Sequence, residues 1–241
     1  MKKIKLFEEF IGEGYYDPGI LKAFFMAGGP GSGKSYVATE LFDFPKGAVS
    51  SVSYATGLKL VNSDNAFETM LKKSGYEVSK IADYAQDPEV WKEVMVLRDQ
   101  AKGTTKRMQD NYINGRLGQV IDGTGKDYNK IKGHRQLYQD LGYDTYMIFV
   151  NTSLETALER NQMRERSLPD KLVKEMWQEV QNNIGRYQGL FGTDKMLIVD
   201  NSGSNEEAIA SAEKVINQKL KLPVQNPLGK IWLKENDPRK R

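Results

Sequence analysis

Gly28-Gly29-Pro30-Gly31-Ser32-Gly33-Lys34-Ser35 is the stretch of this 241-residue chain that decides its fold. It matches the phosphate-binding loop pattern G-x-x-x-x-G-K-[ST] at every fixed position. A polyphosphate needs several backbone N–H groups converging on it, and glycine lets the backbone wrap that closely. We expect Lys34 to reach the β- and γ-phosphates of ATP and the Ser35 hydroxyl to bind Mg²⁺. Together with Tyr36, which opens the next helix, these residues form the predicted nucleotide site.

The segments around this loop follow the order strand, loop, helix. Residues 23–27 form a short apolar run of buried-strand length, and residues 36–41 are predicted to form a helix that ends before Pro45. Helices separate four further predicted strands, at 58–62, 119–122, 146–150 and 196–200. Apolar strands that alternate with helices form a parallel sheet covered on both faces. The predicted fold class is therefore α/β, a P-loop NTPase three-layer sandwich with a mainly parallel sheet.

The amino-acid composition limits the kinds of protein that this chain can be. Apolar residues make up 39% of the chain and charged residues 28%, which is ordinary for a globular protein. The formal charge of +3 neither demands nor excludes a nucleic-acid partner. Cysteine is absent, which excludes disulfides and thiolate metal sites. No apolar run approaches the ~20 residues that span a bilayer, so no membrane partner is expected. The predicted location is the cytoplasm, or the host cytoplasm if the chain is phage-encoded.

The two ends of the chain are predicted to be extensions of one central domain. Apolar residues at helical spacing identify residues 1–19 as an amphipathic extension that packs on the body. Residues 20–219 are assigned to the P-loop domain. Residues 220–241 are expected to form an extended tail with a basic end.

Capping patterns predict where helices begin. Thr152 and Glu155 have the spacing of a capping box. Asp87-Pro88 is an N-cap and first-turn pair, and it opens a long helix that ends near residue 114. One continuous helix is predicted over 170–187.

Two carboxylates and a threonine fall where predicted strands end, which is where parallel sheets bind ligands. Asp64 follows the strand at 58–62, and Asp122 closes the strand at 119–122. A hydroxyl acceptor needs a base or a positioning carboxylate near the γ-phosphate, and we assign Asp64 to that role, with helix capping as the alternative. Asp122 is expected to help bind Mg²⁺ or to contact the acceptor. Thr124 either binds the acceptor or only shapes the turn.

Three arginines cluster at the end of a predicted helix, before Pro169. Arg160 and Arg164 lie one turn apart, and Arg166 opens the following loop. We interpret the three as a mobile lid whose positive charge stabilises the phosphoryl group during transfer. The alternative is a solvated helix face that pairs with neighbouring glutamates.

Other polar residues receive less specific interpretations. Arg98, Lys102 and Lys106 recur every four residues on the long predicted helix. Such a basic stripe is usually a solvated face, although it could follow a phosphate backbone. His134 shares a helix face with apolar residues and is predicted to be a half-buried packing residue.

The chain lacks features expected of a water-activating nucleotide hydrolase. One common arrangement places Glu directly after the Asp that closes the second acidic strand, and here Gly123 follows Asp122. A guanine-reading Asn-Lys-x-Asp pattern is also absent from the sequence. The residues therefore favour transfer of the γ-phosphoryl group of ATP to a substrate hydroxyl. Two alternatives stay open: an ATP-binding, slowly hydrolysing accessory protein without an acceptor, and a nucleic-acid-binding module.

Four motifs together resemble a known group of enzymes. They are the loop at 28–35, Asn62-Ser63-Asp64, the segment 120–124 and the arginine-rich segment 160–169. In this order, over roughly residues 20–200, the chain resembles zeta-toxin-type kinases and the kinase domain of phage polynucleotide kinase. The resemblance implies that Asp64 activates the acceptor, that the three arginines belong to the lid, and that Asp122 and Thr124 lie in the acceptor pocket.

The chain departs from both relatives at the acceptor side. Zeta toxins usually have Glu where Asp122 stands. Polynucleotide kinases carry an Arg shortly after the position of Asp64, and residues 65–68 contain none. The acceptor is therefore left open among small molecules, nucleosides, nucleotide sugars and nucleic-acid ends.

Overall fold

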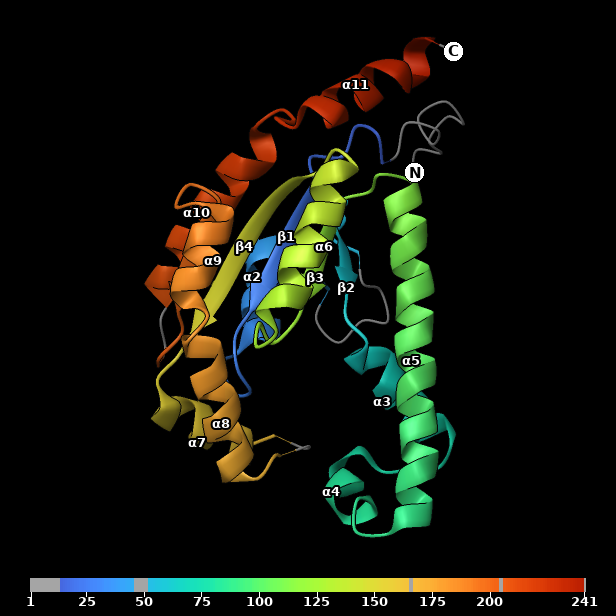
Figure 1. Ribbon diagram of the computed structural model, residues 1–241, viewed down its shortest axis with the longest axis vertical. Helices are drawn as coiled ribbons and strands as arrows, with labels where there is room; N and C mark the ends of the chain where they lie inside the picture. Colours follow the sequence, from blue (N-terminus) through green and yellow to red (C-terminus); the bar gives the residue numbers. More distant parts are fainter. Residues whose placement is uncertain (1–13, 46–51, 165–166, 204–205, 241) are drawn as a thin grey trace, which may run out of the picture.

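The centre of the molecule is a parallel sheet of five strands. The computed structural model describes residues 14–45, 52–164, 167–203 and 206–240. The sheet has the order β2-β3-β1-β4-β5 (Figure 1). Its strands are β1 (Lys22–Ala27), β2 (Lys59–Val61), β3 (Gln119–Asp122), β4 (Asp144–Asn151) and β5 (Met196–Asp200). Every strand pairing within it is parallel, so all five carboxyl ends reach one edge.

Helices cover both faces of this sheet, because side chains of β1 alternate between two cores. Phe24 and Met26 face a core shared with α2 (Lys34–Phe42) and α10 (Glu206–Lys221). Phe25 faces the opposite core, which includes residues of α6 (Tyr128–Asp140), α9 (Ile184–Phe191) and α11 (Pro227–Glu235). Continuous apolar strands are expected where helices cover a sheet on both sides. The predicted three-layer α/β sandwich is confirmed.

A third, smaller core lies beside the carboxyl edge of the sheet. It joins α3 (Asp64–Lys73), η1 (Val78–Lys80), α4 (Ile81–Tyr84) and the long helix α5 (Pro88–Asn114). Phe67, Leu71 and Val94 are its buried centre. Figure 1 places α4 and the start of α5 well beyond the strands, at the end opposite α11. This helical unit therefore stands over the edge of the sheet where ligands bind.

The region after Lys221 differs from the predicted extended tail, because it contains α11 and η2 (Pro238–Lys240). The Asn226 side chain accepts a hydrogen bond from the Leu228 N–H, and Pro227 occupies the first turn, so α11 has a regular helix start. Trp232 then packs into the core shared with α6 and α9. The prolines that indicated an extended chain instead begin a helix.

Two helix boundaries also differ from the predictions. The helix predicted over 170–187 is divided into α8 (Asp170–Gln181) and α9, because the Asn183 side chain donates hydrogen bonds to the carbonyls of Gly125 and Lys126. The N-cap of α7 (Leu154–Gln162) is Ser153, whose hydroxyl accepts from the Thr156 N–H, and not Thr152 as predicted.

The amino-terminal extension is described only from Gly14 onward, so its predicted helix at 1–13 lies outside the described residues. The Tyr15 hydroxyl donates to the Leu233 carbonyl at 2.6 Å, which ties this segment to α11. Among the described helices, none is long and apolar enough to cross a membrane.

Candidate active site

The loop between β1 and α2 has the geometry of a phosphate cradle. Gly31 and Gly33 have φ of 75° and 79°, which glycine adopts without strain. A Cβ at Gly31 would lie 2.1 Å from the Ala157 carbonyl oxygen, so no other residue fits there. The Gly28 N–H donates to the Thr124 carbonyl at 3.0 Å, which fastens the loop to the turn after β3. The glycines of the predicted loop are thus required by its shape.

Asn201, just beyond β5, holds the same loop from the other side. Its amide donates to the Ser32 carbonyl at 2.8 Å, and a Cβ at Gly33 would lie 2.3 Å from that amide nitrogen. Ser32 is buried, yet its hydroxyl has no hydrogen-bond partner in the structure. A buried donor without a partner is costly, and an incoming phosphate oxygen would satisfy it.

Lys34 begins α2 and is close to three other charged groups of the site. Burial lowers the pKa of Lys34 below its usual value, and Arg164 also lowers it, while the carboxylates of Asp122 and Asp64 oppose the shift. Bound phosphates would add negative charge beside the ammonium group and favour its charged form. The structure therefore brings together Lys34, Asp64, Asp122 and Arg164.

Asp122 ends β3, and its side chain is half-buried. Burial raises the pKa of the Asp122 carboxyl, while Lys34 opposes that shift. One carboxylate oxygen, Oδ2, accepts from the Asn62 amide at 2.8 Å. The other, Oδ1, is buried without a hydrogen-bond partner in the structure. A carboxylate oxygen left free at this point fits Mg²⁺ or one of its waters as a ligand, together with the predicted Ser35 hydroxyl.

Asp64 is the first residue of α3, and its side chain is bound by a residue from another helix. Arg98 of α5 donates to Oδ1 of Asp64 at 2.8 Å, and the guanidinium lies 5.0 Å from the centre of the Phe67 ring. The carboxylate keeps 43% of its surface exposed, so an acceptor can still approach it. The Asn62 side chain accepts from the Asp64 N–H at 2.7 Å. The contact to Arg98 replaces the capping contact that was the alternative for Asp64.

The arginine-rich segment is fastened by one buried side chain. Asn161, near the end of α7, donates to the Leu168 carbonyl and accepts from the Leu168 N–H, at 2.8 and 3.0 Å. These two bonds close a loop that begins after α7 and contains Arg164, which is exposed. Arg164 is close enough to Lys34 to shift the pKa of the latter. Arg166 lies outside the described residues.

Arg160 lies in a different place from the one its lid assignment suggests. Its guanidinium donates to the carbonyls of Asn201 and Gly203 at 2.7 and 3.0 Å. It lines a cavity of about 280 Å³ at the end of the phosphate loop. The other residues around that cavity are Gly33, Tyr36, Asn201, Gly203, Glu206 and Ile209. In this structure Arg160 belongs to the wall of a slot beside the loop.

Comparison with known proteins places this site in a family. A family model described as an AAA domain matches residues 24–186, which is more than half of the chain and includes the phosphate loop, both aspartates and all three arginines. The chain belongs to this AAA-domain family. No sequence among curated proteins matches the chain.

Solved structures share the fold of this AAA-domain protein at low identity. A protein from Chloroflexus aurantiacus provisionally described as a kinase has a TM-score of 0.54 at 13% identity, covering 83% of this chain and 98% of its own. A structure from the PezAT toxin–antitoxin system of Streptococcus pneumoniae has a TM-score of 0.53 at 13% identity, covering 88% and 92%. The AvrRxo1-ORF1:-ORF2 complex solved with ATP has a TM-score of 0.50 at 16% identity, covering 90% and 73%. The fold is that of P-loop kinase-like proteins; the likeness to phage polynucleotide kinase stays a prediction.

A cavity of about 700 Å³ beside the site lies between α5 and α6. Asp122, Gly123 and Thr124 line it next to the phosphate loop, which is consistent with the predicted position of Asp122 and Thr124 on the acceptor side. Asn183 and Tyr187 fix this wall by hydrogen bonds to the Gly125 carbonyl. His134 is half-buried, as predicted, and it also lines this cavity.

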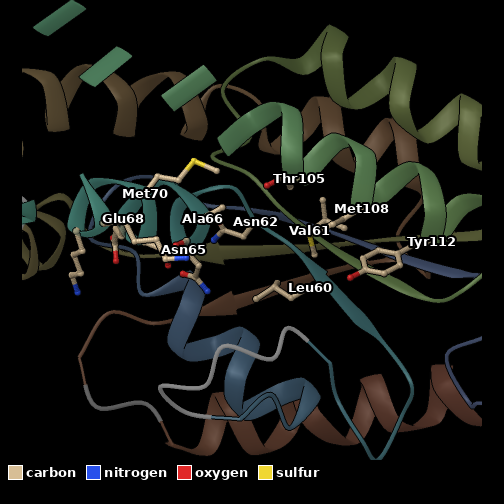
Figure 2. A pocket seen from close by; sticks show the side chains of 13 residues that line it. Leu60, Val61, Asn62, Asn65, Ala66, Glu68, Met70, Thr105, Met108 and Tyr112 are labelled. Carbon is tan, nitrogen blue, oxygen red and sulfur yellow. Dashed lines mark hydrogen bonds between the residues drawn. The ribbon is translucent and has the colours of Figure 1, made fainter. Parts of the chain in front are cut away.

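A second cavity of about 600 Å³ lies on the other side of α5, between α3 and the edge strand β2 (Figure 2). Met70, Met108 and Tyr112 make much of its wall apolar, and Asn62 and Asn65 lie between Met70 and Tyr112 in this view. Val61 and Thr105 line both cavities. The bridge from Asn62 to Asp122 therefore lies between this cavity and the acceptor side of the site.

Four functional contacts were not predicted from the sequence. Asn62 was quoted in a motif without a role, although it contacts both aspartates of the site. Arg98 was placed on a solvated stripe, and Asn161 and Asn201 were given no role. The position of Asn62 two residues before Asp64 was a usable signal. The contacts of Arg98 and Asn201 have no local signal in the sequence, because each joins segments far apart in the chain. Asn161 contacts Leu168, seven residues later, across the loop that follows α7.

Proposed function

We propose that this protein is an ATP-dependent kinase that transfers the γ-phosphoryl group of ATP to a hydroxyl group of an acceptor, with Mg²⁺. One observation carries the proposal. A phosphate loop with Lys34 and two carboxylates with different surroundings meet at the carboxyl edge of the sheet, next to a cavity large enough for a second substrate. A hydrolase needs no such cavity beside its carboxylates.

The nucleotide would bind across the loop. The backbone of residues 28–35 and Lys34 would hold the phosphates, and the slot beside Gly33 and Tyr36 would hold the base against the Arg160 guanidinium. That guanidinium is fixed by two carbonyls, so it presents a flat cationic face at little cost in side-chain entropy. The AvrRxo1-ORF1:-ORF2 structure with ATP supports nucleotide binding by this fold.

Mg²⁺ would be held by the Ser35 hydroxyl and by Asp122, and would neutralise charge on the β- and γ-phosphates. Asp122 has the oxygen for it, since Oδ1 has no other hydrogen-bond partner in the structure.

The acceptor hydroxyl would lie against Asp64. Its oxygen forms a bond to the γ-phosphorus, the bond from that phosphorus to the bridging oxygen breaks, and ADP leaves. The hydroxyl proton passes to the Asp64 carboxylate. Arg98 holds that carboxylate in place, and Arg164 supplies charge to the transferred group. Arg166 keeps its predicted place in the lid as part of this proposal.

Transfer assays with γ-labelled ATP test the proposal. The wild-type protein is incubated with mixtures of nucleosides, nucleotide sugars, sugars and 5′-hydroxyl oligonucleotides, and labelled products are separated from phosphate. We expect one class to be labelled and Asp64→Asn to lose ~10²–10⁴-fold in that rate. The affinity for Mg²⁺-ATP should be unchanged in Asp64→Asn and lost in Lys34→Met.

Three results would contradict this proposal or a part of it. Hydrolysis of ATP alone at about 10 turnovers per second, the median enzyme rate, would favour a hydrolase. Asp64→Asn with unaltered transfer would remove Asp64 from the reaction. Slow hydrolysis with no labelled acceptor would favour the accessory ATP-binding protein.

A further inference from the structure

The cavity between α5 and α6 has a charge pattern that narrows the class of acceptor. Two lysines of α5, Lys102 and Lys106, line one wall, and Lys126 and Lys130 line the wall at the start of α6. Basic residues from two separate elements therefore line the same cavity. Lys102 and Lys106 are exposed, as the spacing on α5 indicates, and they also line this cavity.

Three of these lysines lack partners. Lys102 pairs with Asp99 at 3.1 Å, whereas no ion pair of Lys106, Lys126 or Lys130 occurs within the described part of the chain. Two further carboxylates also line the cavity. Asp127 is engaged as the N-cap of α6, where it accepts from the Lys130 N–H. Asp110 lies one turn after Lys106 on α5, on the side away from the reacting edge, and no ion pair joins the two in the described structure.

The position of the lysines along the cavity is also informative. Helix α6 starts directly after β3, so Lys126 and Lys130 lie near the carboxyl edge where Asp122 and Asp64 stand. Helix α5 runs from beyond that edge back toward the start of β3 (Figure 1). Lys106 therefore lies nearer the carboxyl edge of the sheet than Gln109 and Ile113, which follow it on the helix. The positive charge is therefore concentrated at the reacting end of the cavity.

The half of the cavity that lies away from the reacting edge, called the inner half below, has a different lining from the lysine-lined half. Its lining carries the Asp110 carboxylate, is polar at Gln109, His134 and Tyr138, and is apolar at Ile113, Ile131 and Leu137. The 11 residue steps from Lys102 to Ile113, at about 1.5 Å each, give a length of about 16 Å. A small sugar acid would leave most of this volume, about 700 Å³, unfilled.

We infer that the acceptor is itself a phosphorylated small molecule of about nucleotide size. Its phosphate group binds Lys106, Lys126 and Lys130, its reacting hydroxyl points back to Asp64, and its uncharged ring occupies the inner half of the cavity. This inference rests on the proposed kinase function, but the test below measures binding and not transfer, so the two can fail separately.

The test uses protein in which the phosphate loop is filled with a saturating non-hydrolysable ATP analogue and Mg²⁺. Calorimetry then measures binding of two matched pairs, uridine with uridine 5′-monophosphate and ribose with ribose 5-phosphate. We expect the phosphorylated member of at least one pair to bind tenfold or more tightly than its partner. The triple variant Lys106→Gln/Lys126→Gln/Lys130→Gln should abolish this difference and leave the affinity for the ATP analogue unchanged.

A matched control removes the same charge elsewhere. Lys132, Lys214 and Lys230 are exposed and line none of the cavities described above. Their triple replacement by Gln should keep the preference for the phosphorylated probe.

Several outcomes would overturn the inference. They are equal binding within both pairs, no binding of either phosphorylated probe, and a preference that survives in the lysine variant. Binding of a single-stranded oligonucleotide with a salt slope near −0.7 per contact, without binding of the monophosphates, would instead assign the lysines to nucleic acid. If the lysine variant transferred phosphate to an uncharged acceptor at the wild-type rate, the proposed kinase function would stand and the proposal of a phosphorylated acceptor would fail.

Discussion

At the scale of single residues, the site consists of groups whose surroundings give them different tasks. Asp122 is half-buried beside Lys34, and its buried Oδ1 has no partner in the structure, whereas the carboxylate of Asp64 is held by Arg98 and stays partly exposed. A buried carboxylate with a free oxygen suits a metal, and an exposed one fixed by an arginine suits a mobile acceptor. The two aspartates are therefore not interchangeable.

Asp122→Asn tests whether function and stability oppose each other at this residue. The folded-state pKa of Asp122 is raised, so the folded protein loses stability from this group as pH rises through that pKa. The amide removes the buried charge and can still accept from Asn62. We expect the melting temperature of the nucleotide-free variant at pH 7.5 to equal or exceed that of the wild type. The corresponding gain in the free energy of unfolding should be at most about 1 kcal/mol. The difference should shrink as the pH falls toward the ordinary carboxyl pKa.

Mg²⁺-ATP binding by Asp122→Asn should be weaker than in the wild type, because a metal ligand is lost. Asp127→Ala, which removes the cap of α6, serves as the comparison and should cost about 1 kcal/mol at both pH values. A lower melting temperature of Asp122→Asn at pH 7.5 would contradict the conclusion that burial disfavours the charge of Asp122.

At the scale of elements, long-range side-chain bonds set the positions of the functional segments. Asn183 ends α8 early because its amide is bound to the turn after β3. Asn201 ties the end of β5 to the phosphate loop, and Asn161 closes the loop that follows α7. Three asparagines thus fix segments that lack regular secondary structure of their own.

Asn161→Ala should loosen the segment that carries Arg164. The Leu168 N–H and C=O would lose their partners, and Asn161 itself is fully buried. Because misplaced catalytic groups lose rate steeply, we expect kcat for transfer to fall about tenfold or more, with a smaller change in KM for ATP. Trypsin should also cut faster after Arg164. Gln162→Ala, at the exposed neighbouring residue, should leave both rates unchanged; equal effects of the two variants would reject the role of Asn161.

At the scale of the whole molecule, the carboxyl-terminal region is part of the sheet domain. The Lys22 ammonium group of β1 is buried and donates to the carbonyls of Pro18, Leu220 and Leu222 at 2.8, 2.5 and 2.9 Å. The Asp144 carboxylate accepts from the N–H groups of Gln225 and Asn226. These bonds fasten the end of α10 and the start of α11 to the amino edge of the sheet, far from the site.

Lys22→Met should therefore lower global stability without changing the chemistry. Three buried or half-buried carbonyls would lose a charged donor, and we expect the free energy of unfolding to fall by about 2–4 kcal/mol in urea titrations. Lys221→Met, at an exposed lysine beside the same helix end, should change it by less than about 0.5 kcal/mol. A rate of transfer per folded molecule that falls with Lys22→Met would contradict a purely structural role.

The sequence by itself determined the sheet, the phosphate loop and the carboxylates at the strand ends, because these depend on local patterns. Gly31 and Gly33 are dictated by their own backbone, and apolar runs of strand length by burial on two faces. The tertiary structure alone decided that Arg98 holds Asp64, that Arg160 lines the slot beside the loop, and that residues 227–235 form a helix against the core. A charged or polar side chain has no local signal for a partner that lies many residues away, since that choice is made only when the elements pack.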